Sequence, residues 1–168
     1  VDTLGKETNL ATIDSVVITR QEIYNGNSYY IFEGTNSPLN KNFGFINALR
    51  DSSGYIVDKN GLIRFTAINF IDTLLSQEEI FENDTLYTLT FKMEEISELV
   101  SVPAGKFEVL NFKGTLIARI LFQNTKKPRY INKFYAKGVG KILDSYYYLS
   151  HPSRSEKRLI RYHIEKNK

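Results

Sequence analysis

The sequence predicts an all-β protein whose antiparallel strands form a meander curled into a half-barrel or barrel. Three observations lead to this prediction. The 168 residues include 11 Tyr and 11 Phe but no Trp, and aromatic side chains favour pleated, half-buried strands. Apolar and polar residues alternate along several segments, as in strands with one buried face. Short stretches rich in Asn, Gly, Ser or Pro separate these segments and fit tight turns.

The first two strands are predicted as a hairpin over residues 14–24 and 28–34. Both segments are rich in β-branched and aromatic residues. The pair Asn25-Gly26 between them suits the positive φ values of a type I′ turn. We therefore expect the two strands to pair directly and antiparallel.

A third strand and a second hairpin follow. Residues 43–50 are predicted as the third strand and residues 51–54 as the turn after it. Residues 55–57 and 62–65 then flank residues 58–61, where a second Asn-Gly pair marks the tight point.

Residues 68–83 interrupt the alternation. Ser76 followed by Glu79 fits a capping box, which predicts a short helical turn. Because the segment is brief, a loop is the alternative.

The rest of the chain returns to strand patterns. Residues 85–93 alternate clearly and predict a half-buried strand. Residues 96–102 and 106–121 are predicted to pair around a turn at Val102-Pro103-Ala104-Gly105. Three further strands are predicted at 131–137, 139–150 and 155–165. About ten strands result, in a single β domain over residues 1–168, since no linker divides the chain.

Charge is unevenly distributed along the chain. Residues 1–125 carry 10 basic and 16 acidic side chains (net −6), whereas residues 126–168 carry 12 basic and 3 acidic ones (net +9). A basic cluster of this kind can attract phosphate-rich partners. Because no nucleic-acid module with base-stacking aromatics is visible, we favour a solvated or edge-protecting role and predict no nucleic-acid partner.

The absence of Cys excludes disulfides, thiolate metal sites and cysteine nucleophiles. No apolar run approaches the roughly 20 residues that a membrane helix needs. The chain begins at Val1, which is consistent with a processed N-terminus or with a trimmed one. We expect membrane contact only through an N-terminal anchor upstream of this residue, if one exists.

A pair of motifs carries a family resemblance. The first is Val102-Pro103-Ala104-Gly105-Lys106-Phe107, and the second, about 25 residues later, is Tyr135-Ala136-Lys137-Gly138-Val139-Gly140. Together they resemble an uncharacterised family of secreted or lipoprotein-type bacterial β-domains common in Bacteroidetes. The resemblance covers roughly the last 70 residues and implies a fold similar to periplasmic lipoprotein-carrier half-barrels. It also implies an extracytoplasmic location, in the periplasm or attached to the outer membrane. It implies no activity, and the chain lacks the lipobox Cys of a lipid anchor.

Candidate catalytic and metal motifs fail on particular residues, so we predict no catalytic residue, no metal site and no cofactor. Gly138-Val139-Gly140-Lys141 lacks the spacing of a phosphate loop, and its glycines predict a bulge or bend. Residues 58–61 lack the ligand positions of a calcium loop. His151 and His163 are twelve residues apart and are interpreted as surface histidines.

Two groups of glutamates keep a hydrolase hypothesis open. They are Glu78, Glu79 and Glu82, and Glu94, Glu95 and Glu98. Two carboxylates across a groove could serve as the acid and base of glycoside hydrolysis. Acidic side chains at strand ends are more often solvated.

The aromatic residues are the remaining candidates for ligand binding. Inward-facing rings in a curled sheet could line a cavity for an acyl chain, although core packing is the commoner use of such rings. The candidate ligand-binding residues are Tyr87, Phe91, Phe112, Tyr146, Tyr148 and Tyr162, with Phe107 beside them. Three functions remain open: a non-enzymatic envelope domain that binds a ligand or envelope protein, a carrier of a hydrophobic small molecule, and a carboxylate-dependent hydrolase.

Overall fold

The computed structural model contains two compact units, and each is described by itself. The N-terminal unit comprises Thr8–Ile68, and the C-terminal unit comprises Val1–Glu7 with Asn69–Lys168. Both are built of antiparallel strands, and the described residues contain no helix, so the predicted all-β class is confirmed. The single-domain prediction stays a prediction. The structure describes residues 1, 5–9, 12–35, 44–82, 84–96, 99–118, 128–147 and 153–165.

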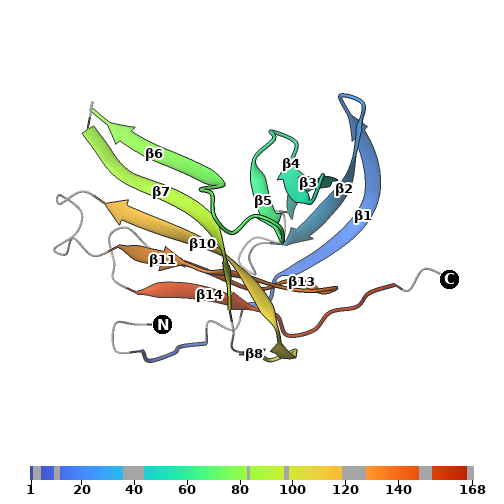
Figure 1. Cartoon of the computed structure of the whole chain (residues 1–168). Helices are drawn as coiled ribbons and strands as arrows, with labels where there is room; N and C mark the ends of the chain where they lie inside the picture. The colour runs from blue at the N-terminus through green and yellow to red at the C-terminus, as the bar shows by residue number, and fades with distance from the viewer. Residues whose placement is uncertain are drawn as a thin grey trace. The chain divides into compact units, whose positions relative to one another are not determined.

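The N-terminal unit is a five-stranded meander in which each strand pairs with the next along the chain (Figure 1). The turn between the first two strands is Asn25-Gly26, with φ values of 49° and 75°. These values are those of a type I′ turn, so the predicted first hairpin is confirmed. The strands are β1 (Ser15–Tyr24), β2 (Asn27–Thr35), β3 (Gly44–Ser52), β4 (Tyr55–Asp58) and β5 (Ile63–Thr66).

The turn after β3 is tighter than the predicted one at 51–54. Strand β3 continues through Ser52, which pairs with Tyr55. Ser53 and Gly54 alone make the turn, at φ values of 55° and 86°. Asp51 is within the strand, where its carboxylate accepts a hydrogen bond from the Gly54 N–H at 3.0 Å.

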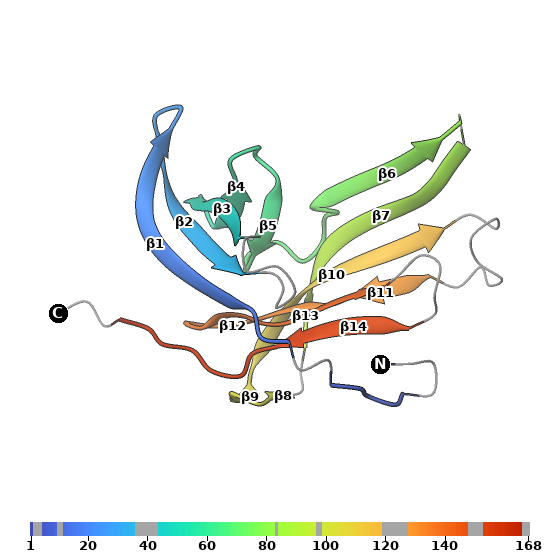
Figure 2. The same cartoon turned by 180° about the vertical axis from the view of Figure 1, so that it is seen from behind.

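The C-terminal unit is a larger open sheet with the strand order β14-β13-β12-β10-β7-β6. Strand β11 pairs with β10 beside β12, and β8 and β9 form a separate hairpin (Figure 2). Fourteen strands are therefore described, against about ten expected. The strands are β6 (Leu75–Phe81), β7 (Asp84–Glu95), β8 (Val100–Val102), β9 (Gly105–Phe107), β10 (Val109–Ala118), β11 (Arg129–Ile131), β12 (Lys133–Ala136), β13 (Gly140–Tyr147) and β14 (Arg154–Arg158).

Residues 68–74 lie outside any strand, as the loop alternative predicts, but the segment with the capping pattern is a strand. Residues Leu75–Phe81 form β6, the edge strand of the larger sheet. Leu75 lies opposite Phe91, and Phe81 lies opposite Asp84. The capping pattern is a local signal, and pairing along β7 satisfies the backbone of this segment instead.

Several predicted strands are interrupted. Glu108 separates β9 from β10, and Asn132 separates β11 from β12. The predicted strand at 155–165 ends at Arg158. The glycines that were expected to mark a bulge or bend lie at a hairpin, where Gly138 is in the turn with φ 73° and Gly140 begins β13 with φ 96°. The register of this hairpin shifts between Phe134 and Tyr135.

Apolar side chains of the C-terminal unit gather under the β8–β9 hairpin. Val102, Val109, Ala136, Ile142 and Leu143 form this buried cluster. Partly buried residues, including Phe107 and Leu159, pack against it. The predicted turn at 102–105 therefore folds an apolar hairpin onto the sheet.

A second buried group lies between β7 and β10. The rings of Phe91 and Phe112 stack with centroids 4.8 Å apart, and Met93 is fully buried on the same face of β7. Gly114 is directly opposite Phe91, whose ring covers it. In the N-terminal unit, the corresponding core is the cluster of Tyr29, Ile31 and Ala48.

Candidate functional site

Strand β1 is an exposed edge of the N-terminal sheet. Among the described strands it pairs with β2 alone. The described part of the chain provides no backbone hydrogen bond to the outer side of residues 16–24. A bulge at Thr19 interrupts the register, since Ile18 pairs with Phe32 and Arg20 with Ile31. Within the described ranges, these outer backbone groups have the unpaired character of a sheet edge.

One face of β1 and β2 carries an exposed apolar row, which consists of Val16, Ile18, Ile23 and Tyr30. The register places all four on one face. Val16, Ile18 and Ile23 pair with even-numbered residues of β2, Tyr30 is itself an even-numbered residue of β2, and alternate residues of a strand share a face. Each side chain keeps at least half of its surface exposed, and Ile23 keeps 76%. Contiguous exposed apolar residues of this kind are typical of interaction surfaces.

The opposite face of β1 carries charged side chains beside the exposed Val17. Arg20 donates hydrogen bonds to Glu22 at 2.5 Å and to Glu33 on β2. Tyr24 donates its hydroxyl to the other Glu22 oxygen. The bonds from Tyr24 and Arg20 lower the pKa of Glu22, so its carboxylate is ionised at neutral pH. The edge is thus apolar on one side and carries both charges on the other.

The loop between β4 and β5 is organised by a buried carboxylate. The Asp58 Oδ1 atom accepts the N–H groups of Asn60 at 2.8 Å and Leu62 at 3.1 Å, and Oδ2 accepts two bonds from Arg64. Burial raises the pKa of Asp58, but the bonds from Arg64 and from the two backbone groups outweigh it and hold that pKa below its usual value. The Asp58 carboxylate therefore ties the two ends of the loop together.

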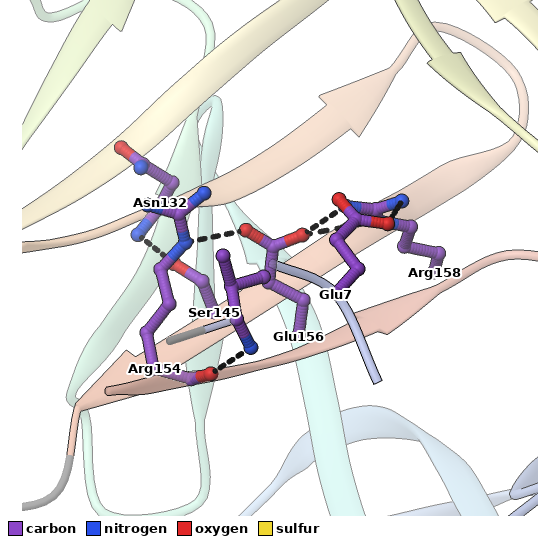
Figure 3. Close-up of polar contacts among 7 residues, drawn as sticks. Glu7, Asn132, Ser145, Arg154, Glu156 and Arg158 are labelled. Carbon is purple, nitrogen blue, oxygen red and sulfur yellow. Dashed lines mark hydrogen bonds and ion pairs between the residues drawn. The ribbon is translucent and has the colours of Figure 1, made fainter. Parts of the chain in front are cut away.

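A polar cluster in the C-terminal unit consists of Asn111 and Ser145, which are buried, and Asn132, which is partly buried. Asn132 and Ser145 are drawn in Figure 3. The Asn111 amide donates to the Asn132 side-chain oxygen at 2.9 Å and accepts the Lys133 N–H at 3.1 Å. The Ser145 hydroxyl accepts the Asn132 N–H at 2.8 Å. These side chains satisfy the backbone groups that are released where Asn132 interrupts the strand.

An ion-pair row runs beside this cluster on β14. Glu156 accepts bonds from Arg154 at 2.7 Å and from Arg158 at 2.6 Å, and Arg158 also holds Glu7 through both of its terminal nitrogens (Figure 3). Burial raises the pKa of Glu156, but the bonds from both arginines outweigh it and lower that pKa. Val1 exchanges two backbone hydrogen bonds with Arg154 at the strand edge.

The side chains of the ion-pair row and the polar cluster form hydrogen bonds and ion pairs that stabilise the sheet. Every charged side chain of the ion-pair row is matched by an opposite charge, and the low pKa of Glu156 opposes a role as general acid. Ser145 accepts a hydrogen bond from the Asn132 N–H, and within the described ranges no histidine bonds its hydroxyl. Among the described residues, no group of three His, Asp or Glu could hold a metal ion.

The predicted aromatic residues do not come together as one site. Phe91 and Phe112 stack in the core, and Tyr87 is half-buried on β7. Tyr146 and Tyr162 are exposed, and Tyr162 contacts Phe107 edge to face with centroids 6.2 Å apart. Tyr148 lies outside the described residues. The ligand-binding prediction stays a prediction. Two of its residues, Phe91 and Phe112, are buried and pack against each other.

The other candidate residues are distributed over the surface. Glu94 binds Lys113 at 3.0 Å, while Glu78 and Glu79 are exposed on the edge strand β6. His163 is exposed beyond β14, and His151 and Glu98 lie outside the described residues. Of the C-terminal basic residues, Lys141 pairs with Asp144, a neighbour on its own strand.

Sequence reasoning missed the apolar row, the polar cluster and the role of Asp58. The strand predictions over 14–24 and 28–34 contained the apolar row, but alternation alone does not tell which face stays uncovered. The polar cluster had one available signal, namely Asn residues inside strand patterns, which favour local breaks.

Comparison with known proteins adds no relative. No protein-family model, no curated protein and no solved structure matches the chain. None of the described segments is a helix long and apolar enough to cross a membrane.

Proposed function

We propose that this chain is a non-enzymatic binding domain of the bacterial cell envelope that recognises a protein partner through β1. The observation that supports the proposal is the exposed ten-residue edge strand with its apolar row. The envelope location is supported by the resemblance of the two motifs around Pro103 and Gly138 to secreted bacterial β-domains.

An open edge strand suits a partner in extended conformation. Such a partner adds main-chain hydrogen bonds to the sheet, and its alternate side chains reach the two faces of the edge. On β1 one face offers Ile18 and Ile23, and the other offers Arg20 and Glu22. The expected partner strand is therefore apolar on one face and charged on the other.

Hydrophobic carriage and hydrolysis have less support in the described residues. Two of the candidate rings, Phe91 and Phe112, stack on each other on one face of the paired strands β7 and β10, with Gly114 under the Phe91 ring. Of the glutamates considered for hydrolysis, Glu94 pairs with Lys113, and Glu78 and Glu79 are exposed on the edge strand β6. We therefore place the function at the edge strand.

Peptide selection tests the binding proposal. A displayed library of random peptides is selected on the immobilised protein and counter-selected on a Val16→Lys/Ile18→Lys variant. We expect peptides with alternating apolar residues, and hydrogen exchange in their presence should slow at residues 16–24. Protection elsewhere, or no enrichment against the variant, would refute the proposal.

The location is tested separately, by fractionating cells that express the full-length precursor. The proposal expects the protein in the periplasmic or membrane fraction. Recovery in the cytoplasmic fraction alone would overturn the envelope assignment and leave the β1 experiment to be judged by itself.

A further inference from the structure

Besides the open edge of β1, the described part of the chain contains a segment after β14 that belongs to no sheet. After β14 the backbone is held at Leu159, whose N–H donates to the Ile142 carbonyl at 2.8 Å and whose carbonyl accepts from the Ala104 N–H at 3.0 Å. Residues 160–165 then run on outside any sheet (Figure 2). No hydrogen bond to residues 160–165 is found in the part of the chain that the structure describes. We call residues 161–165 the tail.

The tail has the side-chain pattern of a strand. Tyr162 and Ile164 keep about half of their surface exposed, although the Tyr162 ring contacts Phe107. Arg161, His163 and Glu165 alternate with them and are exposed. If the tail is extended in a sheet, its apolar residues face one side and its charged residues the other.

We propose that the tail of one copy adds antiparallel to residues 20–24 of β1 in a second copy. The proposal rests on the proposed binding function and names a second copy of this chain as the partner. The complementary register pairs Glu165 with Arg20, His163 with Glu22, and Arg161 with Tyr24. On the other face it pairs Ile164 with Gln21 and Tyr162 with Ile23.

Charge complementarity selects this register and direction. Opposite charges across two strands are stabilising, like charges are destabilising, and an Arg over a tyrosine ring is favourable. Parallel addition on the same faces would place Arg161 against Arg20. An antiparallel tail moved by two residues would place His163 against Arg20 and run Ile164 into the bulge at Thr19.

Pairing of β1 with β1 of a second copy is less favourable. With Glu22 at the two-fold axis, two carboxylates face each other. With Gln21 at the two-fold axis, Arg20 of each strand pairs with Glu22 of the other. This ladder contains only three residue pairs before it reaches the bulge at Thr19. The tail offers five consecutive pairs without crossing the bulge.

The contact between tail and edge joins two different surfaces. Each copy carries one tail and one edge, so association is heterologous and continues into chains or rings. A five-residue strand forms a small interface, and we expect it to be weak and concentration-dependent.

Two complementary variants test the proposal. The edge variant Ile23→Lys places an ammonium group on the strand edge, where Lys discourages pairing. The tail variant His163→Pro/Ile164→Pro removes two consecutive N–H groups, which point to opposite edges of a strand. One of the two would face β1 whichever edge of the tail pairs, so at least one hydrogen bond of the ladder is lost. The matched controls are Ile71→Lys, at an exposed site outside both segments, and His163→Asn/Ile164→Val, which keeps both N–H groups.

Sedimentation velocity at rising protein concentration measures the size of the species that each variant forms. Circular dichroism confirms that each variant is folded. The parent chain and both controls should form species larger than a dimer. The edge and tail variants should each remain monomeric, with association weakened by about tenfold or more. An equimolar mixture of the two should form a dimer and stop there, since it contains one intact tail and one intact edge per pair.

Three results would overturn the proposal: a parent chain that is monomeric at every concentration, a tail variant that still associates, or a mixture that stays monomeric. A monomeric parent whose β1 still selects peptides would remove self-association and leave the binding function. Loss of both self-association and peptide selection would remove the proposed function as well.

Discussion

Replacing Gly114 by Ala tests the packing between β7 and β10. A Cβ atom at this position would lie 2.8 Å and 2.9 Å from two ring atoms of Phe91, and 3.1 Å from the Ile131 Cβ. The ring has little room to move, because it stacks on Phe112 at 4.8 Å and the Lys133 ammonium lies 4.9 Å from its centroid. The substitution therefore overpacks a buried contact.

The expected loss follows from two opposing contributions. Overpacking of a core typically costs about 1–3 kcal/mol. Replacing Gly by Ala in a strand recovers about 0.5–1 kcal/mol, because the unfolded chain loses conformational freedom. We expect Gly114→Ala to lower the free energy of unfolding by about 1–2 kcal/mol, which corresponds to a fall in Tm of roughly 2–8 °C for a chain of this size.

A double-mutant cycle isolates the contact between Gly114 and Phe91. Phe91→Leu alone should cost about 1–2 kcal/mol, less than truncation to Ala. The double variant should cost less than the sum by about 1 kcal/mol, because the new methyl group fills space that the ring leaves. Urea unfolding followed by tyrosine fluorescence measures each value, and Ile117→Ala on the same strand is the exposed control. Strict additivity, or a neutral Gly114→Ala, would refute the packing argument.

Three further substitutions test the polar groups. Asp58→Asn should lower the free energy of unfolding by about 1–2 kcal/mol at neutral pH. Because the folded-state pKa of Asp58 is lowered, its contribution to stability is present above the unfolded pKa and disappears as pH falls through the folded pKa. In urea unfolding, the difference in stability between Asp58→Asn and the parent chain should therefore be smaller at pH 3 than at pH 7. Glu156→Gln should follow the same pH direction with about 0.5–1.5 kcal/mol, and a difference that persists in acid would contradict it. Asn111→Ala leaves the Lys133 N–H without its acceptor and should cost about 1–3 kcal/mol, with faster hydrogen exchange at that amide; unchanged exchange would contradict it.

The turns were the best-predicted part of the fold. Asn25-Gly26 requires positive φ at both positions, and the sequence supplies residues that adopt it. The loop at 58–61 was also placed correctly, although its organising residue is Asp58 rather than the Asn-Gly pair alone. Turn chemistry is local, so a few adjacent residues are enough to predict it.

Partner choice between strands was harder to predict. Residues 75–81 look locally helical, yet they pair with β7, whose outer side would otherwise be unpaired. The break at Asn132 depends on Ser145 and Asn111, which are distant in sequence. The Asn residues inside the strand patterns indicate a break, but the partners that complete these contacts follow only from the assembled sheet.

The bulge at Thr19 bears on what β1 can bind. Exposed edges invite open-ended pairing, and natural sheets limit it with bulges and charged residues. On β1 the bulge and the charged pair of Arg20 and Glu22 lie next to each other, so the uninterrupted stretch is residues 20–24. A partner strand must therefore be short and must present an acid against Arg20, while its other face is apolar. The tail meets these requirements with Glu165 and Ile164, whereas a second β1 strand does not. The bulge and the charged pair that limit open-ended pairing of this edge would therefore also select its partner.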